Sequence, residues 1–95
     1  MGKRINSREE LWERAAAMLP KGIPTEAIDD VEIDYECDIM GRRCFNGYWI
    51  YLAAGYICKD MECHTIHEDT LADIKEKMAS VDVWEDDPML NERRC

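Results

Sequence analysis

Residues 31–39 alternate without exception between apolar and acidic side chains. The apolar positions are Val31, Ile33, Tyr35, Cys37 and Ile39, and the acidic positions are Glu32, Asp34, Glu36 and Asp38. Because successive side chains of a β-strand point to opposite faces, the segment is predicted to be a half-buried strand with one apolar and one anionic face. Carboxylates on that face stand roughly 6.6 Å apart and repel one another, so folding alone does not explain an acid at every outward position.

The acidic run continues on the N-terminal side of this strand. Asp29 and Asp30 bring the total to six acids within residues 29–38, and a second acidic cluster follows near the end of the chain at Glu85, Asp86 and Asp87. The simplest interpretation is a solvated face that keeps the protein in solution and discourages pairing between strand edges. The uniform sign favours a second interpretation, in which these carboxylates contact a partner.

The net charge of −9 restricts the class of that partner. A chain of this sign is repelled by phosphate backbones and anionic lipid surfaces, which argues against direct binding to nucleic acid or to membranes. Basic proteins are the favoured partners, including proteins that themselves bind nucleic acid.

Length and composition predict one domain of 95 residues, with an ordered core over about 7–84 and an acidic tail over 85–95. The N-terminus has no apolar signal region and no segment is long enough to span a membrane, so we expect a cytoplasmic protein. The five cysteines are odd in number, which favours reduced thiols over a disulfide framework.

Capping patterns and apolar periodicity predict the elements that flank the acidic strand. Ser7 and Glu10 form a capping box for a helix that ends by Pro20 and Gly22, and one short helical turn is expected at 25–28. Thr65 and Glu68 form a second capping box. The helix that it opens would carry one apolar face, made of Thr70, Leu71, Ile74, Met78 and Val81.

The segment between these helices is predicted to form strands. A turn is expected at 40–42, and Asn46-Gly47 indicates either a hairpin turn or a bulge within one long second strand. Residues 48–53 are apolar throughout, which is typical of a central strand. A third strand is expected over about 56–63, and a short edge strand over 81–84.

The predicted fold class is therefore α+β, with the order α-β-β-β-α and both helices on one face of a three-stranded antiparallel sheet. Over roughly residues 7–80 this order resembles the double-stranded-RNA-binding domain. That family places lysines at the start of its second helix to hold phosphates. The matching stretch here contains His67, Glu68, Asp69 and Thr70, so the resemblance is limited to topology.

Aromatic residues of the central strand provide a further candidate surface. Trp49, Tyr51 and Ala53 share one face, and Tyr48, Ile50 and Leu52 share the other. If both helices cover one face, an aromatic row remains on the open face as an anchor for a partner or a dimer interface. In the alternative interpretation, the C-terminal tail with Trp84 folds over these rings.

Cysteines and histidines form the one candidate metal motif. Cys58, Cys63, His64 and His67 follow a C-x4-C-H-x2-H spacing, and thiolate and imidazole are zinc ligands. The wide first gap and the adjacent Cys63-His64 pair fit such a site poorly, so we expect thiols that pack as small hydrophobic groups and no bound metal. No catalytic residue, cofactor or enzymatic activity is predicted.

Small size, acidity and rows of carboxylates resemble phage-encoded anti-defence proteins, including DNA mimics and anti-CRISPR inhibitors. The resemblance implies a stoichiometric inhibitor that occupies the basic nucleic-acid-binding groove of a host nuclease complex. Its partner residues would be the acids of 29–38, the cluster 85–87, Trp49 and Tyr51. The alternatives are a homodimeric structural or regulatory module and a zinc-stabilised adaptor.

Overall fold

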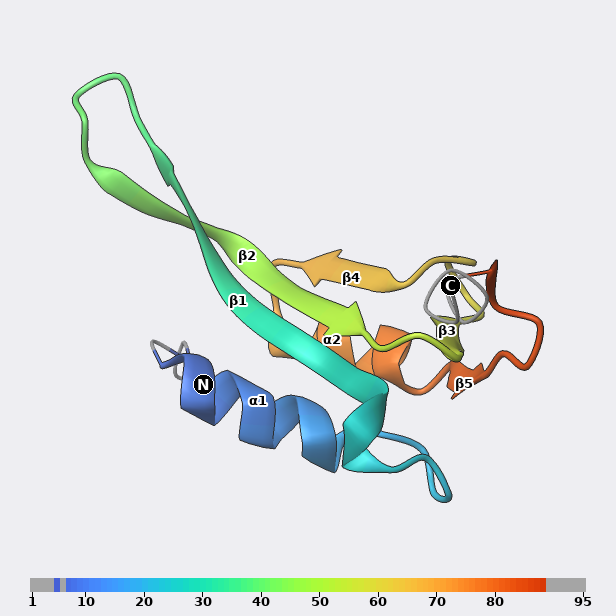
Figure 1. Cartoon of the computed structure of the whole chain (residues 1–95). Helices are drawn as coiled ribbons and strands as arrows, with labels where there is room; N and C mark the ends of the chain where they lie inside the picture. The colour runs from blue at the N-terminus through green and yellow to red at the C-terminus, as the bar shows by residue number, and fades with distance from the viewer. Residues whose placement is uncertain (1–4, 6, 89–95) are drawn as a thin grey trace.

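The computed structural model describes residue 5 and residues 7–88, and it contains two antiparallel sheets and two α-helices (Figure 1). In chain order the elements are α1 (Arg8–Ala17), the 3₁₀ helix η1 (Thr25–Ala27), β1 (Ile28–Cys37), β2 (Arg43–Leu52), β3 (Tyr56–Cys58), β4 (Thr65–Glu68), α2 (Leu71–Met78) and β5 (Val81–Val83). One sheet has the strand order β1-β2-β4, and the other pairs β3 with β5. The α+β class is therefore confirmed.

The N-cap at Ser7, the short helical turn and the edge strand near residue 81 are also confirmed. The Ser7 hydroxyl accepts a hydrogen bond from the backbone N–H of Glu10, which satisfies one of the free donors at the start of α1. η1 occupies the predicted turn, and β5 lies within the expected edge strand.

Strands β1 and β2 form one long ladder with a bulge. Their pairing runs from Ile28–Leu52 to Cys37–Arg43, and the register shifts between the pairs Asp34–Gly47 and Tyr35–Phe45. Asn46 is the extra residue, so Asn46-Gly47 is a bulge within β2 and the hairpin interpretation is wrong. The hairpin turn lies at the predicted residues 40–42, where Gly41 has φ +79°.

The third strand predicted over about 56–63 is wrong as a single element: only β3 at its start is a strand, it belongs to the second sheet, and the strand beside β2 is β4, which lies beyond the predicted range. β3 pairs with β5, whereas β4 pairs with β2. The chain turns between them, and Glu62 there has a positive φ of 53°. The second capping box is wrong too: Thr65 and Glu68 lie in β4, and Thr70 caps α2 by accepting from the N–H of Asp73.

The predicted order α-β-β-β-α and the predicted helix placement also need correction. Five strands replace three, and β5 follows α2. α1 packs mainly along β1, and α2 along β4, so each helix follows one edge strand of the sheet. A helix with its side chains is about 10–12 Å wide, roughly two strand spacings, so a three-stranded sheet offers each helix one edge. Within residue 5 and residues 7–88, no helix is long and apolar enough to cross a membrane.

The core lies on one face of the three-stranded sheet. Val31, Ile50 and Ile66 are neighbours across the three strands, and all are fully buried. The helices contribute Leu11, Ala15, Ile74 and Met78 to the same core. Side chains that alternate with these on the strands therefore point away from the core.

The paired ends of β1 and β2 extend beyond the rest of the molecule as an arm, defined here as residues 35–45. β4 pairs with β2 only over 48–51, and Figure 1 shows the arm projecting past both helices. At its tip, Ile39 is fully exposed and the Met40 side chain is 76 % exposed. The predicted apolar face of the strand is thus buried at Val31 but exposed at Ile39.

Candidate functional site

Acidic and aromatic side chains share the sheet face that points away from the core. Glu32 of β1 lies directly across from Trp49 of β2, which lies across from His67 of β4. Asp34 and Tyr51 occupy the next outward positions of β1 and β2, so the face joins carboxylates to aromatic rings. We call these five residues, Glu32, Asp34, Trp49, Tyr51 and His67, the acidic-aromatic face.

The rings of this face form a continuous row. Trp49 and Tyr51 are stacked, with centroids 5.8 Å apart and planes inclined by 8°. The His67 ring lies 4.2 Å from the Trp49 ring. All three side chains are half-buried, so they are held in place by neighbours while part of each ring meets solvent.

Asp34 is held within this face by hydrogen bonds. Its Oδ2 atom accepts from Asn46 Nδ2 at 2.8 Å, which is the largest cause of a lowered pKa, with smaller contributions from Trp49 and His67. His67 Nε2 is buried and lies 3.3 Å from the same oxygen, but the two atoms do not form a hydrogen bond. Asp34 is thus committed to contacts inside the protein.

Two other acids of the predicted run also have internal partners. Asp30 forms an ion pair with Arg8, which lowers the pKa of its carboxyl group. Asp38 accepts from the backbone N–H groups of Met40 and Arg42 at 2.9 Å and pairs with the Arg42 side chain at 3.0 Å. The first contact joins α1 to β1 and the others hold the turn of the arm, so the predicted six acids are not one uniform surface.

The remaining three acids are exposed: Asp29, Glu32 and Glu36. In the described part of the structure, none of them pairs with a basic side chain. Glu32 Oε2 accepts from the Tyr51 hydroxyl at 3.3 Å, and Glu36 Oε1 accepts from Asn46 at 3.2 Å. Neutral donors leave the negative charge of these carboxylates unbalanced. Glu32 and Glu36 are therefore the carboxylates best placed to meet a cationic partner.

The second predicted acidic cluster needs a correction at Asp87. Its side chain is only 1 % exposed, accepts from the backbone N–H of Gly55 at 2.7 Å and lies 2.8 Å from His64 Nε2. Asp87 consequently holds the chain after β5 against the turn before β3 and cannot contact a partner. Glu85 and Asp86 are exposed. Trp84 stacks on His64 with centroids 5.4 Å apart, so this ring does not cover Trp49.

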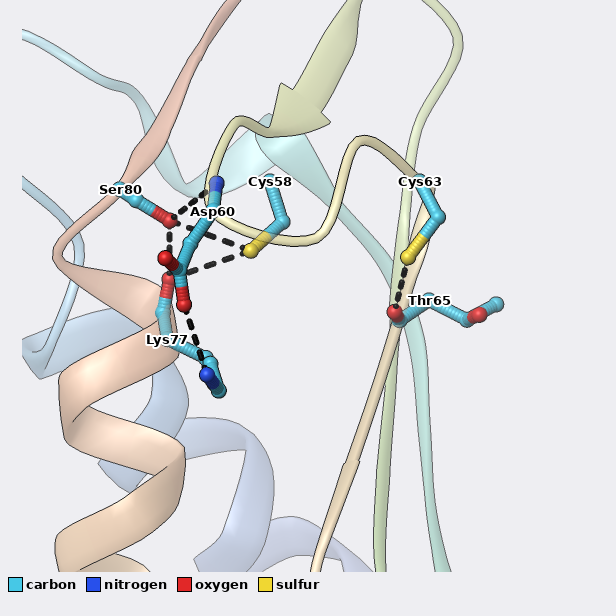
Figure 2. A network of polar contacts seen from close by, with 6 residues as sticks. All are labelled: Cys58, Asp60, Cys63, Thr65, Lys77 and Ser80. Atoms are coloured by element: carbon cyan, nitrogen blue, oxygen red, sulfur yellow. Dashed lines mark hydrogen bonds and ion pairs between the residues drawn. The ribbon is translucent and has the colours of Figure 1, made fainter.

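The two cysteines of the zinc motif contact different residues (Figure 2). Cys58 Sγ contacts Ser80 Oγ at 3.2 Å and the Lys77 carbonyl oxygen at 3.4 Å, whereas Cys63 Sγ contacts the Thr65 carbonyl oxygen at 2.9 Å. Among the described residues there is no group of three or more potential metal ligands. Cys58 instead joins β3 to the end of α2.

Sequence reasoning missed three participants: the ring of His67, the amide of Asn46 and the apolar tip of the arm. Thr65-Ile66-His67 does alternate, and a strand assignment would have placed Ile66 inward and His67 outward. The role of Asn46 follows from the bulge, which no local pattern specified. Comparison with known proteins adds no assignment: no protein family matches the chain, and no curated protein or solved structure is significantly similar to it.

Proposed function

We propose that this chain is a cytoplasmic, non-enzymatic inhibitor that binds a basic protein through the acidic-aromatic face. The partner surface would be a nucleic-acid-binding groove, such as that of a host nuclease complex, and the role would be phage anti-defence. The single observation that carries the proposal is the position of Glu32, which lacks a basic partner in the described structure, beside the half-exposed rings of Trp49 and Tyr51.

Electrostatics and ring contacts would serve different steps of binding. Exposed carboxylates steer a cationic surface toward the face and raise the association rate, an effect that salt weakens. Aromatic side chains bury a large area with few rotatable bonds, so they slow dissociation once contact is made. Glu36 extends the acidic surface from the sheet onto the arm.

The arm supplies a second contact for the same partner. Ile39 and Met40 at its tip expose apolar surface to water, and burial of such surface is favourable. An arm that enters a groove while the sheet face covers the rim would obstruct access by nucleic acid. The exposed tip also favours the competing candidate function, a homodimer, although facing copies of the acidic-aromatic face would repel each other.

The test compares two charge-reversed double variants in binding to nucleic-acid-binding proteins captured from a host lysate at low salt. E32K/E36K changes the proposed surface, and E13K/E76K makes the same charge change at exposed positions of the two helices. A partner of the proposed kind binds wild type and the helix variant, is lost by the face variant and releases labelled DNA when wild-type protein is added.

The salt dependence provides the second readout. Wild-type affinity should fall steeply as salt rises. In E32K/E36K, the association rate should fall by a larger factor than that by which the dissociation rate rises. Equal losses in both double variants would show a general effect of net charge and contradict the proposal. Sedimentation of the purified protein tests the homodimer.

A further inference from the structure

We infer that the acidic-aromatic face recognises arginine side chains and discriminates against lysine. The inference rests on the proposed function and specifies the chemistry of the partner surface. The observation behind it is that a carboxylate, Glu32, lies beside two stacked rings, Trp49 and Tyr51.

The geometry of the rings favours a planar cation. Trp49 and Tyr51 are stacked with their planes inclined by only 8°, and part of each ring meets solvent. A guanidinium group is planar and can extend such a stack, whereas a lysine ammonium is a compact, strongly hydrated point charge. Arginine therefore gains a stacking contact with the rings that the ammonium of lysine does not make.

Glu32 supplies the charged contact beside the rings. It is exposed, directly opposite Trp49, and oriented by the hydroxyl of Tyr51 at 3.3 Å. A carboxylate in this position can accept two parallel N–H bonds from a guanidinium that stacks on the rings. Asp34 does not serve this role, because it lies opposite Gly47 rather than Trp49, and both Asn46 and His67 lie against its carboxylate.

The protein uses the same combination within its own fold. The Arg8 guanidinium lies 5.6 Å from the Trp12 ring centre while it pairs with Asp30. Arg43 lies 4.3 Å from the ring centre of Tyr35 on the arm. In the part of the chain that the structure describes, no arginine lies over Trp49 or Tyr51, so these rings are free to accept an arginine from outside.

The experiment measures binding of two short peptides of equal length and charge, one of alternating arginine and glycine and one of alternating lysine and glycine. Wild-type protein should bind the arginine peptide about two- to fivefold more tightly, the range expected for a cation over an exposed ring. The Trp49 side-chain NMR signal should shift on addition of the arginine peptide, with Trp12 as the internal reference.

Variants of the rings show whether the selectivity arises on this face. W49V and Y51V keep a residue suited to a strand and remove one ring each, so either should reduce the arginine-to-lysine ratio toward one. W12V is the control and should retain the ratio. Should W49V fail to fold, Y51V and the wild-type NMR shift still decide the outcome.

Three results would overturn the inference. Equal affinity for both peptides would refute arginine selectivity while the proposed binding of a basic partner still stood. Selectivity that persists in Y51V, without a shift at Trp49, would place it elsewhere on the molecule. Failure to bind either peptide at low salt would count against both the inference and the proposed function.

Discussion

At the residue scale, the absence of a side chain at Gly47 of β2 leaves room for His67 and Glu68 of β4. Its φ is +135°, and a Cβ atom there would lie 2.8 Å from His67 Nε2 and 3.0 Å from the Glu68 carbonyl oxygen. We expect G47A to lower the free energy of unfolding by about 1–3 kcal/mol, through backbone strain and steric overlap together. Chemical denaturation measures the loss.

Gly41 provides the matched control, because its φ is +79° and nothing lies within 4 Å of a Cβ atom placed there. G41A should therefore show the strain without the overlap and lose less stability than G47A. Adding H67A to G47A should restore part of the loss. Equal effects of the two glycine substitutions would contradict the proposed overlap.

The ion pair of Asp30 with Arg8 predicts a pH dependence. Because the pKa of Asp30 is lowered in the folded protein, its stabilisation is fully present above the unfolded pKa of about 3.9 and is lost as pH falls through the folded value. D30N should be less stable than wild type at neutral pH by no more than about 1 kcal/mol, since both partners are about half exposed. Urea denaturation at neutral and acidic pH should show the difference vanish at low pH. A difference that stays the same as the pH is lowered would contradict this explanation.

At the element scale, the arm and the core should respond oppositely to polar substitution. Ile39 and Met40 make little contact with the rest of the protein, so I39S/M40S should change the free energy of unfolding by less than about 0.5 kcal/mol. Thermal denaturation tests this expectation. A larger loss would mean that the arm tip packs against the protein in solution.

The helix α1 contacts the core through Leu11 more than through Trp12. Leu11 is fully buried, whereas Trp12 is half-buried and its ring meets Arg8. L11A should cost about 2–5 kcal/mol, as for other large-to-small changes in a core. W12A should cost less, because part of the Trp12 ring meets solvent. Calorimetry of both variants checks the order, and the reverse order would contradict this packing.

At the scale of the whole molecule, stability should not depend on metal. The thiols of Cys58 and Cys63 contact oxygen atoms of different residues, and structural zinc would contribute folding free energy directly. A chelator should therefore leave the melting temperature unchanged, and elemental measurement should find no stoichiometric zinc. A marked fall in melting temperature with EDTA would contradict this prediction.

The sequence by itself determined those features that depend on neighbours along the chain. The alternation over 31–39 predicted a strand and its two faces, because a strand has a side-chain period of two whatever surrounds it, although β1 ends at Cys37 and Asp38 and Ile39 lie in the turn. Ser7 and Glu10 likewise determined the start of α1, since a helix cap is completed within four residues. The exposure of Glu32 was predicted in the same way, whereas for Trp49 and Tyr51 the alternation predicted a shared face and left open whether the chain covers it.

Only the tertiary structure decided where distant segments meet. Thr65 and Glu68 satisfied a helix-capping pattern, but pairing with β2 and burial of Ile66 made that segment a strand. Asp87 belonged to an acidic cluster by sequence and became buried through Gly55 and His64, which lie far from it along the chain. Long-range pairing and burial outweigh local preference at such positions, because their free energy depends on partners that a local pattern does not contain.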